Sequence, residues 1–147
     1  MCRKLIADWG EHKGNVYCYG DSTGGNRGTA KVAGSDWDLI KAALRPVFGD
    51  RLYFRVPLAN GPERSRINAL NSRIKNSHGV IRLAVDAQKA PHVVTDLEGV
   101  RLLEGGGGEI DKKYDPMLTH ISDGLGYYVV RQFPIHDHGV ALTTLAI

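Results

Sequence analysis

The stretch NVYCYGDSTGGNRG, residues 15–28, joins an alternating apolar segment to a glycine-rich loop. In residues 15–20, Val16 and Cys18 alternate with tyrosines, a pattern that is typical of a strand. The glycines and small polar side chains of residues 21–28 predict a loop directly after that strand. A strand that leads through a loop into a helix is the building unit of α/β proteins, so this stretch indicates the fold class.

The segments on both sides of this stretch predict further helices and strands. Residues 2–9 have apolar side chains at helical spacing. Ser35, followed by two acids, predicts an N-capped helix that Pro46 and Gly49 should end. A third helix should open at Pro62 and close at Gly79. The remaining predicted elements are strands over residues 51–56 and 80–85, and helices over residues 91–103 and 116–133. The expected class is α/β with a small sheet.

Length and composition favour one globular domain. The chain has 147 residues, 42% of them hydrophobic and 24% charged, which excludes a disordered tail. The sequence contains no run of about 18 apolar residues, so no transmembrane helix is expected. Its two cysteines are too few for a disulfide scaffold, and a reducing, cytoplasmic compartment is the default expectation.

Charge is unevenly distributed along the chain. Residues 45–82 contain eight basic and two acidic side chains, whereas residues 83–123 contain eight acidic and four basic ones. This asymmetry suits a surface that binds a polyanion beside a metal-binding pole. Two solvated faces of different charge are an equally good interpretation. The basic side chains considered for DNA contact on the predicted third helix are Arg64, Arg66, Arg73 and Lys75.

Asp21 is the first candidate site residue. The loop around it has the glycine spacing of a phosphate-binding P-loop, but Asn26 and Arg27 stand where Lys and Ser or Thr are required, so that interpretation fails. An acid at the carboxyl end of a strand is well placed to project into a crevice. The alternative, and the commoner use of such a residue, is a turn-forming Asp.

His120 and Asp123 form the second candidate, one turn apart on the last predicted helix. Asp123, Gly124 and Gly126 all weaken a helix, which indicates either close packing or a site. A solvated acidic face with glycines at a packing contact is an equally good explanation. The other acids are expected to act as caps, turn residues or solvated side chains, and they are Asp36, Asp38, Asp86, Asp96, Asp111 and Asp115.

Three stretches together resemble the C-terminal nuclease domain of the large terminase subunit of tailed bacteriophages, which packages DNA. The first covers residues 17–24, with Arg27 and residues 35–37 after it. The second covers residues 54–57 with Asn60, followed by residues 66–71. The third covers residues 119–128. Their order and spacing match the family from about residue 2 to residue 130.

The resemblance implies a fold and a site. The fold would be an RNase H-like mixed sheet flanked by helices over residues 1–133, incomplete at the N-terminus because the first strands are lacking, with a tail over residues 134–147. Asp21 and Asp123 match the family's acidic motif and would be catalytic metal ligands, and His120 would orient a ligand or a water. Hard ions prefer carboxylate oxygens, so two Mg²⁺ or Mn²⁺ ions are expected in the complete site.

The implied function is metal-dependent cutting of concatemeric double-stranded DNA, with Arg27 added to the DNA-binding residues. The implied partners are the terminase ATPase domain, the small terminase subunit and the portal, with no membrane, in the cytoplasm of an infected or prophage-carrying bacterium. The family also takes an Asp from a first strand, which is not found before residue 15 here. The alternative is therefore a catalytically incomplete fragment that binds DNA or docks to the motor. Another RNase H-like nuclease, such as a junction resolvase, fits the acidic stretches less well.

Overall fold

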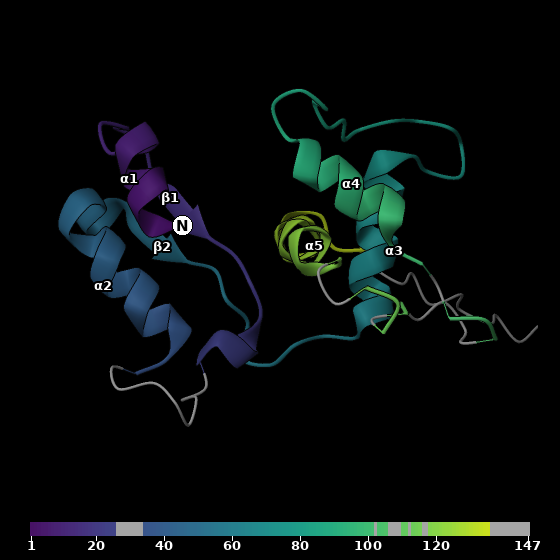
Figure 1. Ribbon diagram of the computed structural model, residues 1–147, viewed down its shortest axis with the longest axis horizontal. Helices are drawn as coiled ribbons and strands as arrows, with labels where there is room; N and C mark the ends of the chain where they lie inside the picture. Colours follow the sequence, from purple (N-terminus) through teal and green to yellow (C-terminus); the bar gives the residue numbers. More distant parts are fainter. Residues whose placement is uncertain (26–33, 102, 106–109, 112, 116–117, 136–147) are drawn as a thin grey trace, which may run out of the picture.

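The computed structural model describes residues 1–25, 34–101, 103–105, 110–111, 113–115 and 118–135. In chain order the elements are α1 (Cys2–Trp9), β1 (Val16–Cys18), the 3₁₀ helix η1 (Ser22–Gly25), α2 (Asp36–Phe48), the 3₁₀ helix η2 (Gly49–Arg51), β2 (Leu52–Phe54), α3 (Glu63–Ile74), α4 (Pro91–Gly99) and α5 (His120–Gln132). Figure 1 shows α1, α2 and the strands on one side of the molecule and α3, α4 and α5 on the other.

The two strands form a parallel pair connected through α2. Val16 pairs with Leu52 and Cys18 with Phe54, so both strands run toward the same edge. A strand, a crossover helix and a parallel strand are the unit that the sequence predicts, and the α/β class is confirmed. Both strands are shorter than expected, and the sheet that the described residues form has two strands. The larger RNase H-like sheet stays a prediction.

α2 begins as the sequence predicts. The Ser35 hydroxyl accepts a hydrogen bond from the Asp38 amide, and the Asp38 carboxylate accepts one from the Ser35 amide, which completes a capping box. The helix does not end at Pro46 but continues to Phe48. Proline in the last turn removes a single helical donor, and the chain leaves the helix only at Gly49, where φ is +55°.

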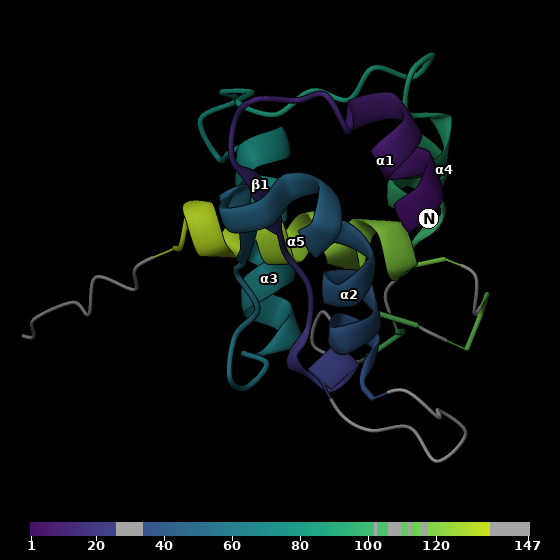
Figure 2. The same ribbon diagram turned by 90° about the vertical axis from the view of Figure 1, so that its left-hand side faces the viewer.

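Two apolar clusters form the core. In the first, Leu44, Phe48 and Leu52 bring α2 and β2 together, with α1 packed against them. In the second, α3 and α5 meet through Ala69 and Val129. Figure 2 shows α5 crossing α3. Each half of the molecule thus buries its own apolar side chains. Helices and sheets must pack against another element in this way to bury their apolar faces.

The strand expected over residues 80–85 is wrong. The Val80 amide donates to the Asn76 side chain, and the Arg82 and Leu83 amides both donate to the Arg73 carbonyl at the end of α3. These contacts satisfy three amides of the segment without a neighbouring strand. α3 itself ends at Ile74, before the glycine that was expected to close it.

The inward side of α5 combines apolar and small residues, with Leu125 and Val129 in the second apolar cluster. Ile121 and Tyr128 are 42% and 40% exposed, whereas Ser122, Gly126 and Val129 are buried. Small side chains allow α3 to approach closely on that face, and the approach decides which side of α5 turns inward. α5 begins at residue 120 and α4 ends at residue 99, so both are shorter than expected.

The two halves meet through aromatic and polar contacts. The rings of Tyr19 and Tyr128 pack edge to face with centroids 5.1 Å apart. The Gln132 side-chain amide donates to the Tyr19 hydroxyl at 2.6 Å. Of the expected tail, residues 134–135 alone belong to the described part of the chain. Among the helices that the structure describes, none has the length and apolar content needed to cross a bilayer.

Candidate functional site

The carboxyl ends of both strands point to one edge of the sheet. β1 ends at Cys18, and Asp21 follows three residues later, while Arg55 follows β2 directly. The Arg55 amide donates to the Cys18 carbonyl at 2.8 Å, so the two exits from the sheet lie side by side. In open α/β sheets this edge is where ligands bind.

Asp21 organises the turn that follows β1. Its Oδ1 accepts hydrogen bonds from the Thr23 hydroxyl at 2.7 Å and from the Gly24 amide at 3.0 Å. Partial burial by itself raises the pKa of Asp21, but these hydrogen bonds and the nearby charge of Arg66 outweigh burial and hold the pKa below its usual value. The turn-forming interpretation is therefore confirmed, and a role in metal binding stays a prediction.

The indole of Trp37 covers the turn. Its Nε1 donates to the Asp21 carbonyl at 2.9 Å. A Cβ at Gly20 would lie 2.5 Å from the Trp37 ring, and one at Gly24 would lie 2.6 Å from it. Glycine is required at both positions because the ring occupies the space that any side chain would fill.

Asn60 holds the turn from the segment after β2. Its side-chain oxygen accepts a hydrogen bond from the Ser22 amide at 2.8 Å. Asn60 and Trp37 thus contact the same turn from two different parts of the chain. Two of the three stretches that carry the resemblance therefore contribute a contact to the turn that contains Asp21.

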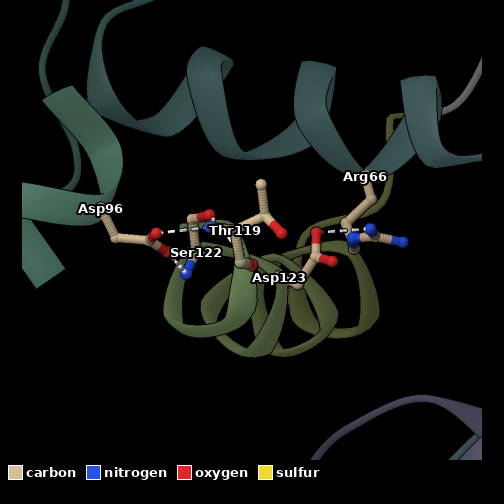
Figure 3. Close-up of polar contacts among 5 residues, drawn as sticks. All are labelled: Arg66, Asp96, Thr119, Ser122 and Asp123. Atoms are coloured by element: carbon tan, nitrogen blue, oxygen red, sulfur yellow. Dashed lines mark hydrogen bonds and ion pairs between the residues drawn. The ribbon is translucent and has the colours of Figure 1, made fainter. Parts of the chain in front are cut away.

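Asp123 is paired with Arg66 across the contact between α5 and α3 (Figure 3). Arg66 Nη2 donates to Asp123 Oδ1 at 2.6 Å, and the two side chains are 8% and 25% exposed. The guanidinium also lies 4.5 Å from the centroid of the Tyr127 ring. A Cβ at Gly126 would lie 2.7 Å from Arg66 Cγ, so the arginine stem fills the space beside the glycine. The close-packing explanation of the glycines in this helix is thus confirmed for Gly126.

Arg66 links the two candidate acids electrostatically. It forms an ion pair with Asp123 and helps to lower the pKa of Asp21. Both acids therefore lie within the field of one buried cation, although they belong to opposite halves of the molecule. That the two carboxylates lie close to each other stays a prediction.

A buried acid fixes the start of the helix that carries Asp123. Asp96, on α4, is 2% exposed, and its two carboxylate oxygens accept hydrogen bonds from the Thr119 and Ser122 amides, each at 2.5 Å. Thr119 has φ of +83°, a left-handed conformation that is unusual for a β-branched residue. Figure 3 shows Asp96 reaching this turn from one side and Arg66 reaching Asp123 from the other. The sequence placed Asp96 only among the acids expected to be caps, turn residues or solvated side chains, and did not distinguish it from the others.

The remaining predicted residues occupy different environments. His120 is exposed at the first position of α5. Arg64 and Lys75 are exposed, and the Arg73 guanidinium lies 4.1 Å from the centroid of the Phe133 ring. Arg27 lies outside the described residues. Arg66 is buried and paired with Asp123, and its expected contact with DNA stays a prediction.

The two candidate acids have the type of oxygen atom that binds a hard cation, but they are fewer than a metal site with three such side chains would need. Asp21 and Asp123 offer carboxylate oxygens, which Mg²⁺ and Mn²⁺ prefer. Within the described ranges, however, no group of three or more His, Cys, Asp or Glu side chains could hold a metal ion. The Asp123 carboxylate is moreover already paired with the positive charge of Arg66. The expected two-ion site stays a prediction.

Arg66 separates two cavities. One, of about 200 Å³, lies between α3, α4 and α5 and is mainly apolar, with Asp123 and Ser122 in its wall. The other, of about 220 Å³, lies where the strand exits meet α3 and α5, and its wall includes Arg55 and Arg131.

Comparisons of the chain with protein-family models, with curated proteins and with solved structures find no match.

Proposed function

We propose that the chain is part of the metal-dependent endonuclease module of a viral DNA-packaging terminase, which cuts concatemeric double-stranded DNA by phosphodiester hydrolysis. The observation that supports this most is the position of Asp21 and Asp123 in the field of one arginine. Two acids from distant stretches that approach a common neighbour are what a convergent carboxylate site requires. Asp21 also lies beyond the carboxyl end of a parallel strand, where ligands bind in such sheets.

The proposed complete site holds two Mg²⁺ or Mn²⁺ ions, whose chemistry is to polarise the phosphodiester and activate water. Asp21 stays ionised to low pH because its pKa is lowered, which suits a ligand for a hard cation. The third acid that such a site needs is proposed to come from an upstream strand, as the resemblance implies. Arg66 positions Asp123 through their ion pair, and His120 lies one turn before it.

The proposed DNA surface is the exposed side of α3, where Arg64 and Lys75 are the charged residues at its two ends. By the same resemblance we propose the ATPase domain, the small terminase subunit and the portal as partners, and the bacterial cytoplasm as the location.

A second candidate is a DNA-binding or motor-docking fragment without catalysis of its own. The Arg66–Asp123 ion pair favours it, since a paired acid is not free to bind a cation. The two candidates differ in one respect, which is whether the chain cuts DNA once the third acid is restored.

The test is plasmid cleavage in Mg²⁺ or Mn²⁺ by the 147-residue chain and by a chain extended with the preceding in-frame residues. We expect weak or no cutting by the short chain and restored cutting by the long one. Asp21→Asn and Asp123→Asn in the long chain should each abolish it, while Asp50→Asn, at a fully exposed turn, should not. An inactive long chain that still binds DNA would instead establish the second candidate.

Strong metal-dependent cutting by the short chain, abolished by Asp21→Asn, would contradict the need for an upstream acid. In that case another acid of this chain, such as Asp36 or Asp115, would complete the site.

A further inference from the structure

The cavity of about 220 Å³ at the strand exits has a wall of unusual charge. Three of its lining residues are arginines, from three different elements: Arg55 after β2, Arg66 on α3 and Arg131 on α5. No carboxylate belongs to the described lining. The wall also contains Gly20, the residue before Asp21, so the cavity adjoins the candidate site.

Two of the three arginines keep their charge for a ligand. Arg66 is neutralised by Asp123 at 2.6 Å. Arg55 and Arg131 are exposed, and in the part of the chain that the structure describes neither forms an ion pair. The Arg55 guanidinium lies 5.4 Å from the centroid of the Tyr17 ring, a contact that orients it without cancelling its charge.

The first turn of α3 lies at the same cavity, where Pro62 and Ser65 form part of the wall. This turn adds little positive potential, because Glu63 is an acid within it and the Ser65 amide already donates to the Pro62 carbonyl. The positive charge of the wall therefore comes from its arginines, whose guanidinium groups bind oxyanions.

We propose that this cavity binds a phosphate group, held by Arg55 and Arg131. Guanidinium groups form paired, charge-assisted hydrogen bonds with phosphate oxygens, and both arginines line the cavity. The identity of the phosphate as a backbone phosphodiester of DNA rests on the proposed function, whereas the binding of phosphate does not. The site thus deepens that function by placing a substrate phosphate beside Asp21.

The test is a titration of the full chain with inorganic phosphate in EDTA, monitored through the NMR chemical shifts of the backbone amides. We expect saturable shifts at residues of the cavity wall. Arg55→Gln and Arg131→Gln should each weaken binding about tenfold or more, because each removes a charge-assisted contact. Arg3→Gln, on the exposed side of α1, makes the same charge change outside the cavity and should leave binding unchanged. Absence of saturable shifts, or equal weakening by all three substitutions, would overturn the proposal.

A second titration identifies the source of the phosphate. A blunt duplex without terminal phosphates should displace inorganic phosphate from the cavity. If a nucleoside monophosphate competes and the duplex does not, the assignment to DNA is overturned and the cavity is a site for a free monoester. Because EDTA removes divalent ions, these results are independent of cleavage, so failure of the nuclease proposal and failure of the phosphate site are distinguishable.

Discussion

At the scale of single residues, Gly126 and Gly124 make a matched pair within α5. A Cβ at Gly126 would lie 2.7 Å from Arg66 Cγ, whereas one at Gly124 would meet nothing within 4 Å. Gly126→Ala should therefore destabilise the chain by about 1–3 kcal/mol, the usual cost of overpacking. Gly124→Ala should stabilise it by up to about 1 kcal/mol, because alanine favours the helix. Urea unfolding of both variants measures the difference, and equal effects would contradict the close contact with Arg66.

Asp21 predicts a pH dependence whose sign follows from its lowered pKa. The folded carboxyl has a pKa below its ordinary value of 3.8, so the folded state binds this proton more weakly than the unfolded state does. Its stabilising contribution is fully present above that ordinary value and is lost as pH falls through the folded pKa. The stability difference between the wild type and Asp21→Asn should therefore shrink below about pH 4. NMR titration of the carboxyl carbon gives the folded pKa directly, and an ordinary or raised value would refute the expectation.

The sequence indicates Asp21 and Asp123 as candidate residues, but it does not indicate which side chains they contact. Asp21 and Asp123 stand out because an acid after a strand and an acid beside helix glycines are both unusual. The pairing of Asp123 with Arg66 joins positions 57 residues apart and leaves no local pattern. Arg66 has the same chemistry as the exposed Arg64, and only the packing of α5 on α3 distinguishes the buried arginine from the solvated one.

At the scale of elements, the start of α5 depends on Asp96 of α4. Asp96→Ala would remove the acceptor of the Thr119 and Ser122 amides in a buried place. Removal of a cap costs about 0.5–2 kcal/mol, and the left-handed backbone at Thr119 loses its support as well. We expect faster hydrogen exchange at the first turn of α5 and lower stability. Asp86→Ala removes an exposed turn acceptor and is the control. Unchanged exchange at Thr119 and Ser122 in Asp96→Ala would show that the cap is not needed.

Element prediction succeeded where the signal is local and failed where it is tertiary. The capping box at Ser35 lies within four consecutive residues, and α2 begins directly after Ser35, as predicted. Residues 80–85 have the composition of a strand, yet their amides bond to the end of α3. The inward side of α5 carries Ser122 and Gly126 as well as Val129, so apolar spacing alone does not define it.

At the scale of the whole molecule, the two apolar clusters belong to separate halves, and the candidate site lies where those halves meet. The α/β class followed from a strand, loop and helix signal within residues 15–48. The arrangement of the halves did not, because the contacts that join them are single side chains such as Tyr19, Tyr128 and Gln132. A pattern of apolar periodicity does not report such contacts.

The distribution of charge over the molecule gives a prediction about DNA binding. Arg64 lies in the first turn of α3 and Lys75 directly follows its last residue, and both are exposed. If they neutralise phosphates, Arg64→Gln with Lys75→Gln should reduce the dependence of log K on log salt by about 0.9 for each phosphate that is no longer neutralised. The chain should stay folded, because neither side chain is buried. Binding of a duplex measured by fluorescence anisotropy at several salt concentrations gives the slope.

Arg66→Gln is the contrasting variant for that measurement. It removes one positive charge, as each of those two substitutions does, but the Arg66 side chain is buried and paired with Asp123. Its removal leaves a half-buried carboxylate without its cation, which should lower the stability of the chain, while the salt slope should stay unchanged because a paired, buried arginine releases no counterion on binding. An unchanged slope in the Arg64 and Lys75 variant would mean that this side of α3 is a solvated face. A reduced slope in a stably folded Arg66→Gln chain would mean that the ion pair opens when DNA binds, and that the buried arginine itself becomes a phosphate contact.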